Sequence, residues 1–182
     1  ASLRAIPNLK VYRPADAVET AECWALALAD RTGPSVIALT RQNLAPARLE
    51  ATDENLCARG AYVLADAPDP HVVLIATGSE VEIALDAQKK LACEKVRARV
   101  VSAPSFELFA TQPHDYRKKV LGKAPRIGIE AAVRQGWDLL LRRRDAFIGM
   151  TSFGASAPAG DLYRHFGITA EKIVEAARAS LR

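Results

Sequence analysis

The sequence is poor in cysteine. Only Cys23, Cys57 and Cys93 occur among its 182 residues, an odd number spaced more than thirty residues apart, with no C-x-x-C element. Neither a disulfide framework nor a cysteine-based zinc site is therefore expected. Long apolar runs are lacking too: none approaches the roughly 20 residues of a membrane-spanning helix, and residues 1–10 contain no apolar signal core. We therefore expect a soluble, cytoplasmic protein.

An excess of charge of one sign is also lacking. The chain has 25 basic and 21 acidic residues, a net charge of +4, and its basic residues cluster only at 117–119 and 142–144, in helix-like stretches with acids nearby. These clusters favour solvated helix faces over a nucleic-acid groove, so neither nucleic acid nor membrane is expected as a partner. With 49% hydrophobic residues, the chain can bury the core of one domain or slightly more. An initiator methionine is absent, so we expect an internal cut in a longer polypeptide.

The first part of the chain has the pattern of a β-α-β unit. A short apolar segment, 9–12, precedes Pro14 and Asp16, and Asp16 with Glu19 has the spacing of a helix-capping box. The helix that follows is predicted to carry one apolar face. That face consists of Ala17, Ala21, Trp24, Ala25 and Leu28.

A second strand and a linker follow. Gly33 and Pro34 end the helix, and the apolar, β-branched run 35–40 predicts a strand that is buried on both faces. Residues 45–58 contain Pro46, several charges and little apolar periodicity, as is typical of a linker. We therefore predict a partial α/β domain at 1–44 and a second domain at 59–182.

The second part alternates strands with helices. Apolar runs predict strands at 60–64, 71–77, 96–102, 126–130 and 146–150. Helices are expected from Ser79, across 106–121 with a break near Pro113, around Trp137, and at 161–166 and 169–181. This order predicts an α/β fold, with a mostly parallel sheet that has helices on both faces and right-handed crossovers.

The turn at 77–79 has some features of a phosphate-binding turn, because the N-terminus of a helix offers free N–H groups to an anion. It lacks the further glycines of a dinucleotide fingerprint and the Gly-Lys-Ser/Thr of a P-loop. Ser79 and Glu82 have the spacing of a capping box. A capped structural turn is therefore favoured over a ligand site.

Two charged residues stand at the ends of predicted strands. Arg41 follows the strand 35–40, and parallel sheets bind ligands just beyond the carboxyl ends of their strands, so its guanidinium could grip a phosphate. From position alone, a surface or ion-paired arginine is favoured. Glu130 could serve as an acid, a base or an intersubunit hydrogen-bond partner, but a structural role is favoured. His71, His114 and His165 have no partner spacing that indicates a triad or a metal site.

Six phrases of the sequence together resemble the transketolase family, in the order of that family and over almost the whole chain. They are RPAD at 13–16, LTRQNL at 39–44, GAYVL at 60–64, IATGSEV at 75–81, VVSAP at 100–104 and GMTSFGASAP at 149–158. Residues 131–145 match no family phrase, which leaves any dimer contact there open.

The resemblance implies a homodimeric enzyme of three α/β domains that uses thiamine diphosphate and Mg²⁺ (or Ca²⁺). Residues 1–44 resemble the end of its pyrimidine-binding domain, and residues 59–182 its C-terminal domain. The implied reaction passes a two-carbon ketol unit from a ketose phosphate to an aldose phosphate. By this resemblance Arg41 binds the phosphate of the sugar. The catalytic, cofactor-binding and metal-binding residues of the family belong upstream, so none is assigned in this chain, and the chain alone is expected to be inactive.

Other identities stay open. Deoxyxylulose phosphate synthase and the β subunit of oxo-acid dehydrogenases share this domain order, although the Arg-Gln-Asn phrase at 41–43 argues against them. A non-catalytic module could instead hold an anion at the turn 77–79, or the chain could be a purely structural dimerisation piece.

Overall fold

The computed structural model describes residues 1–50 and 52–181. Within these residues the strands are β1 (Lys10–Tyr12), β2 (Ser35–Ile37), β3 (Tyr62–Ala65), β4 (Val72–Ala76), β5 (Ala98–Ser102), β6 (Arg126–Glu130) and β7 (Ala146–Gly149). The α-helices are α1 (Ala17–Ala29), α2 (Glu80–Cys93), α3 (Phe106–Ala110), α4 (His114–Leu121), α5 (Ala159–Phe166) and α6 (Ala170–Ser180). Short 3₁₀ helices are η1 (Ser2–Ala5), η2 (Leu56–Arg59) and η3 (Trp137–Leu139). None of the helices in the described residues is long and apolar enough to cross a membrane.

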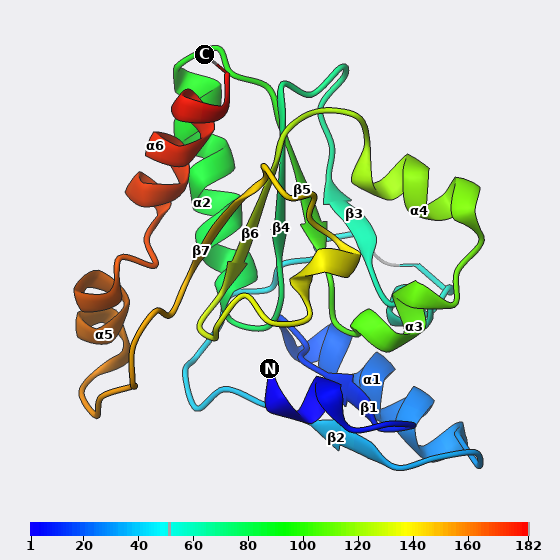
Figure 1. The fold of residues 1–182 in the computed structure, drawn as a ribbon. Coiled ribbons are helices and arrows are strands. Elements are labelled where there is room, and N and C mark those ends of the chain that lie inside the picture. The colour runs from blue at the N-terminus through cyan, green and yellow to red at the C-terminus, as the bar shows by residue number, and fades with distance from the viewer. Residues whose placement is uncertain (51, 182) are drawn as a thin grey trace.

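A five-stranded sheet forms the centre of the larger part of the molecule (Figure 1). Its order is β3-β5-β4-β6-β7, and β5, β4, β6 and β7 are mutually parallel. Only β3 runs antiparallel, at the edge beside β5. The predicted mostly parallel α/β sheet is therefore confirmed.

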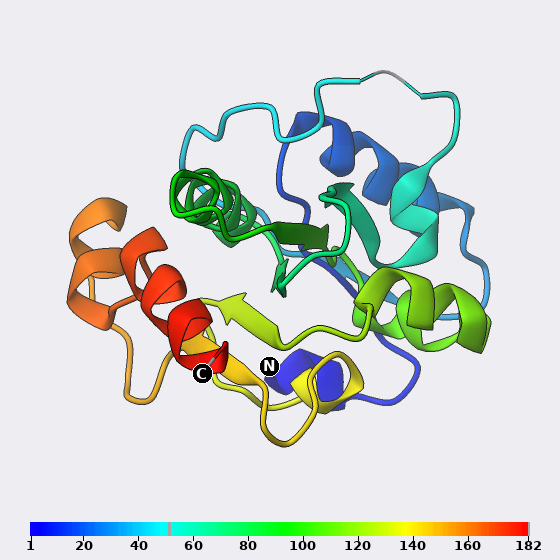
Figure 2. The ribbon, with the colours of Figure 1, turned by 90° about the horizontal axis from the view of Figure 1, so that it is seen from above.

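Helices cover both faces of this sheet, as Figure 2 shows with α2 and α6 on one side and α3 and α4 on the other. Successive side chains of a strand point to opposite faces. Accordingly, Leu74 packs in the apolar cluster that contains α2 and α6, whereas its neighbours Val73 and Ile75 pack in the cluster of α3, α4 and η3. All five residues of β4 are buried, which explains why the sequence shows an unbroken apolar run there.

The segment around Trp137 was predicted to be a helix, and it is only a single 3₁₀ turn, η3. Trp137 is fully buried in the second cluster and lies edge-on to Phe106, with ring centroids 5.0 Å apart. A Cβ on Gly128 of β6 would stand 2.8 Å from the indole ring. The close fit of this indole against a glycine in the strand shows that η3 covers the sheet directly.

The unit β1-α1-β2 lies at the end of the sheet toward which β5 points (Figure 1). Strands β1 and β2 form a parallel pair. The predicted cap of α1 is confirmed, because the Asp16 side chain accepts a hydrogen bond from the Glu19 amide at 2.8 Å. The predicted strand 35–40 is wrong in two respects: β2 ends at Ile37, and its three residues are only half-buried. Strand β2 has a single partner strand and few residues packed over it, so its side chains are only partly buried.

The predicted apolar face of α1 is also exposed. Trp24 and Leu28 are 49% and 67% exposed, and Ala17, Ala21 and Ala25 are exposed as well. The helix instead buries Glu19 and Cys23, which face η2 and the larger sheet. Periodicity identified an apolar face, but the neighbours in the described chain pack on the other side.

The buried Glu19 side chain joins this unit to the sheet. Its carboxylate accepts hydrogen bonds from Tyr62 of β3 at 2.7 Å, from Ser102 of β5 at 2.5 Å and from the Ala15 amide at 2.7 Å. Glu19 is fully buried and no cation contacts it in the described residues. Burial raises the pKa of the Glu19 carboxyl above its ordinary value, and the bonds from Ser102, Tyr62 and Ala15 offset this only in part.

This raised pKa predicts a pH-dependent stability. Because the folded chain holds the Glu19 proton more tightly than the unfolded chain, its stabilising contribution is fully present below the unfolded pKa and is lost as pH rises through the folded pKa. We expect the free energy of unfolding, measured with urea, to fall more from about pH 5 to about pH 8 in the wild type than in Glu19→Gln, by up to about 1.4 kcal/mol per pH unit.

The matched control is Glu82→Gln, which removes an exposed carboxylate from α2 and should leave the slope of the wild type in place. Parallel pH curves for the wild type and Glu19→Gln would show that Glu19 does not titrate differently in the two states.

Candidate functional site

The crevice between β4 and β6 is where an open parallel sheet usually binds a ligand. These two strands are neighbours in the sheet. The helix after β4, α2, covers one face of the sheet, whereas the segment after β6, which contains η3, covers the opposite face. Such a reversal leaves a gap beyond the carboxyl ends of the strands. In this chain Glu80 and Glu130 stand at that gap, and each is only 1% exposed.

The gap is occupied by Arg13, which follows β1. Its guanidinium donates to Glu130 at 2.6 Å and to Glu80 at 2.9 Å, so that one cation joins two buried carboxylates in charge-assisted bonds. The backbone is fixed as well, because the Arg13 amide donates to the Pro104 carbonyl and the Arg13 carbonyl accepts from the Gly78 amide. Gly78 has φ +62, and a Cβ there would lie 3.1 Å from the guanidinium. The Arg13 side chain therefore occupies the crevice in which an open parallel sheet usually binds a ligand.

Glu130 is held from three sides. Besides Arg13, Arg4 donates to it at 2.9 Å and the Trp137 indole N–H at 2.7 Å. Burial disfavours its charge, but the charges of Arg4 and Arg13 and the hydrogen bonds from Arg4 and Trp137 together hold the pKa of the Glu130 carboxyl below its ordinary value. The Arg4 guanidinium also lies 3.8 Å from the centroid of the Phe106 ring. Both carboxylate oxygens are thus engaged within the chain, and the structural role favoured for Glu130 fits the geometry.

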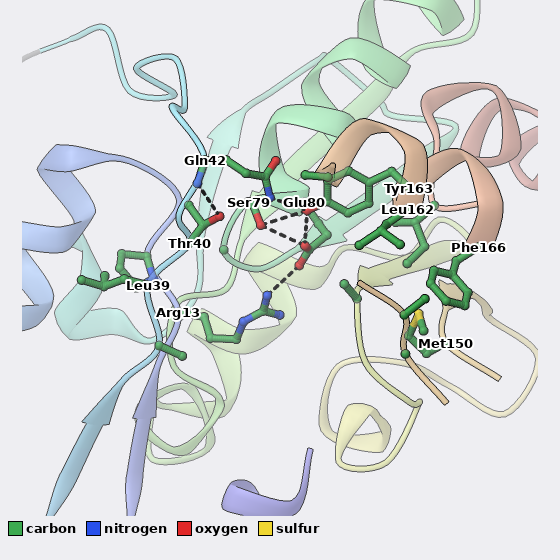
Figure 3. Close-up of a pocket in the computed structure, with 18 residues that line it drawn as sticks. Arg13, Leu39, Thr40, Gln42, Ser79, Glu80, Met150, Leu162, Tyr163 and Phe166 are labelled. Atoms are coloured by element: carbon green, nitrogen blue, oxygen red, sulfur yellow. Dashed lines mark hydrogen bonds and ion pairs between the residues drawn. The ribbon is translucent and has the colours of Figure 1, made fainter. Parts of the chain in front are cut away.

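Glu80 connects Arg13 to α5. Its second carboxylate oxygen accepts from the hydroxyls of Tyr163 at 2.8 Å and Ser79 at 3.0 Å (Figure 3). The predicted Ser79–Glu82 capping box is wrong. Ser79 already has helical backbone angles, and its side chain makes no cap bond because the hydroxyl is turned toward Glu80 and Tyr163.

A cavity of about 340 Å³ lies beside this network. One wall consists of the segment after β2, including Leu39, Thr40 and Gln42 (Figure 3). The opposite wall comes mainly from the C-terminal part, with Met150, Leu162, Tyr163 and Phe166 among its residues. The cavity therefore separates the chain that carries Arg41 from α5.

Arg41 itself does not line the cavity, although both of its neighbours do. It is exposed, and no hydrogen bond or ion pair to its side chain occurs in the described part of the chain. Since β2 ends at Ile37, Arg41 lies four residues beyond the strand and not one, as the longer predicted strand had implied. Arg41 is thus an exposed arginine whose two flanking residues, Thr40 and Gln42, line the cavity.

The other sequence candidates do not form a site. At the turn 77–79, the Gly78 amide is bonded to Arg13 and Glu80 already supplies negative charge, so an anion would meet a carboxylate. No group of three or more potential metal ligands occurs among residues 1–50 and 52–181. His71, His114 and His165 lie apart from the cavity wall.

Sequence reasoning missed Arg13, Glu80 and Tyr163. One signal was available: Glu130 ends the predicted strand 126–130 and Glu80 comes shortly after the predicted strand 71–77. The carboxyl ends of parallel strands meet at one edge of a sheet, so the two carboxylates lie close together and require a cation. Nothing local pointed to Arg13, which lies 67 and 117 residues away from them.

Comparison with known proteins gives matches along nearly the whole chain. Residues 1–46 match the family model "Transketolase, pyrimidine binding domain", and residues 60–169 match "Transketolase-like TK C-terminal domain". The transketolase of Cereibacter sphaeroides is 63% identical over 98% of this chain and 27% of its own length. The chain thus spans about a quarter of the length of such relatives.

Solved structures agree with this match. The transketolase from Leishmania mexicana has a TM-score of 0.90 and 46% identity, covering 99% of this chain and 26% of its own. The transketolase from Pichia stipitis in complex with sedoheptulose 7-phosphate has a TM-score of 0.91 and 32% identity, with coverage of 99% and 26%.

The Arg13 contact generates a test of stability. Arg13→Met leaves two buried carboxylates without their shared cation, and such a loss costs about 3 kcal/mol. Urea unfolding should show this decrease, whereas Arg143→Met, which changes an exposed arginine in the same way, should have an effect within about 0.5 kcal/mol. Equal stabilities of the two variants would mean that the carboxylates are satisfied without Arg13.

Proposed function

Since the chain belongs to the transketolase family, we propose that it supplies two parts of a transketolase. Residues 1–44 are the end of the pyrimidine-binding domain, 45–58 the linker and 59–182 the C-terminal domain. The enzyme that contains them transfers a two-carbon ketol unit from a ketose phosphate to an aldose phosphate. The observation that carries this proposal is the match of both domain models, in order, to one chain whose junction is a buried ion-pair network.

The cofactors are placed in other parts of this enzyme. We assign thiamine diphosphate and Mg²⁺ (or Ca²⁺) to a diphosphate-binding domain and to other residues of the enzyme outside this chain. When bound, thiamine diphosphate serves as the electron sink for the two-carbon unit. The two domain models that match are those for the pyrimidine-binding and C-terminal domains. We assign no catalytic, cofactor-binding or metal-binding residue to this chain.

Arg41 binds the phosphate of the sugar substrate. Its exposed side chain has no hydrogen-bond or ion-pair partner among the described residues, and its neighbours Thr40 and Gln42 in the phrase LTRQNL line the cavity. A guanidinium presents paired donors that match two phosphate oxygens. The Pichia stipitis structure with sedoheptulose 7-phosphate supports a sugar phosphate as the ligand class.

The exposed apolar face of α1 supports a larger assembly. Trp24 and Leu28 lie on this face, and Leu39, 55% exposed, lies in the segment after β2. Apolar residues gathered on one helix face indicate a contact surface. We assign this face to the remainder of the pyrimidine-binding domain, within a homodimer that is cytoplasmic, as is general for the family.

The placement of the cofactors predicts that this chain alone does not turn over. Purified and supplied with thiamine diphosphate, Mg²⁺, a ketose phosphate and an aldose phosphate, it should release no more product than a blank without protein. A complete transketolase in the same assay is the positive control. Sustained turnover by the 182-residue chain would overturn the assignment of the catalytic groups to other parts.

The role of Arg41 predicts a selective kinetic change. In the complete enzyme, Arg41→Ala should raise KM for phosphorylated sugars by about tenfold to a hundredfold, the loss of one charge-assisted contact. KM for an acceptor without phosphate, such as glycolaldehyde, should not change. Arg41→Lys should recover part of the loss, because it keeps the charge but not the paired donors. An unchanged KM for phosphorylated sugars in Arg41→Ala would remove Arg41 from the site.

A further inference from the structure

The segment that carries Arg41 is weakly held. After β2, the backbone of residues 38–43 makes a bond from the Ala38 amide to the Tyr12 carbonyl and a local bond from the Gln42 amide to the Thr40 hydroxyl at 3.2 Å. Ala38, Leu39, Arg41 and Asn43 are exposed. The segment therefore has little packing of its own to fix the direction of Arg41.

One hydrogen bond crosses the cavity to this segment. The Gln42 side-chain amide donates to the Tyr163 hydroxyl at 3.4 Å (Figure 3). In the described residues it is the only hydrogen bond between residues 38–43 and α5. Gln42 and Tyr163 both line the cavity, so this bond spans it.

The accepting hydroxyl is fixed in place. Tyr163 is half-buried and its O–H donates to Glu80 at 2.8 Å, while Glu80 is 1% exposed and paired with Arg13. A phenol that donates to a buried carboxylate can still accept from an amide through its oxygen lone pairs, and the Ser79 hydroxyl oxygen lies 3.0 Å from the same phenol oxygen. The Tyr163 oxygen is thus an anchored acceptor that faces Gln42, and its position is set by the junction of the two parts.

We propose that Tyr163 is a positioning residue for substrate binding, which holds Gln42 and thereby directs Arg41 toward the sugar phosphate. This rests on the proposed function of Arg41. The C-terminal part then influences the affinity for phosphorylated sugars without contacting them. Arg13 and Glu80 hold the Tyr163 hydroxyl, Tyr163 holds Gln42, and Gln42 in turn limits the position of the adjacent Arg41.

The test is a comparison of substrates in the complete enzyme. Tyr163→Phe removes the hydroxyl and keeps the ring, so KM for phosphorylated acceptors should rise about threefold to tenfold, as expected for one neutral hydrogen bond. kcat and KM for glycolaldehyde should not change. Gln42→Met removes the donor and leaves Glu80 and its partners untouched, and it should give the same selective rise. Tyr116→Phe is the matched control, since that hydroxyl donates to the Ala61 carbonyl, away from the cavity.

A double-mutant cycle completes the test. In the Arg41→Ala background, Tyr163→Phe and Gln42→Met should have no further effect on KM for phosphorylated acceptors, because the group they direct is gone. A rise that persists in that background, or an equal rise for glycolaldehyde, would overturn the proposal in favour of general damage to the site.

The two assignments fail in different ways. If Arg41→Ala raises KM selectively while Tyr163→Phe and Gln42→Met do not, Arg41 binds phosphate but Tyr163 does not position it. If Arg41→Ala has no effect, the phosphate assignment itself falls, and the positioning role falls with it.

Discussion

The Arg13 guanidinium between Glu80 and Glu130 is the contact on which the arrangement of this chain depends. Glu130 ends β6 and Glu80 begins the helix after the neighbouring strand β4, and each carboxylate is 1% exposed. Without a cation their burial would be strongly unfavourable. The cation comes from the β1-α1-β2 unit, which is thereby seated over the carboxyl ends of the sheet. The crevice in which open α/β sheets usually bind a ligand serves here to hold a neighbouring structural unit.

A second buried contact, of a different kind, supports the same junction. Glu19 lies on α1 and accepts hydrogen bonds from two hydroxyls and an amide, and no cation of the described residues contacts it. Arg13 and Glu19 lie on either side of the Asp16 cap, so a short stretch of chain is held to the sheet at two points. Ion pairing at one point and hydrogen bonding at the other together hold the β1-α1 part of the unit to the sheet.

The sequence pattern predicts correctly those parts of the fold whose burial or hydrogen bonding is evident from the neighbouring residues in the chain. β4 has an unbroken apolar sequence because helices cover both of its faces, and Asp16 caps α1 because its partner is three residues away. The failures share one cause. Apolar periodicity shows that a face such as that of Trp24 and Leu28 is apolar, but not which neighbour covers it. Ser79 has the spacing of a capping residue, yet its hydroxyl donates to Glu80 and lies 3.0 Å from the hydroxyl of Tyr163, 84 residues away.

For the site, the resemblance singled out Arg41 because its phrase is local, whereas the groups that set its surroundings are far apart in the sequence. Glu80 and Tyr163 lie 83 residues apart, and Gln42 and Tyr163 lie 121 apart. Each link is an ordinary polar pair that composition cannot distinguish from a surface contact. The fold buries the Glu80 carboxylate at the junction, and this buried carboxylate fixes the position of the Tyr163 hydroxyl that donates to it. If Arg41 binds phosphate as proposed, the C-terminal part of the chain sets where that substrate-binding residue points through the bond between Tyr163 and Gln42.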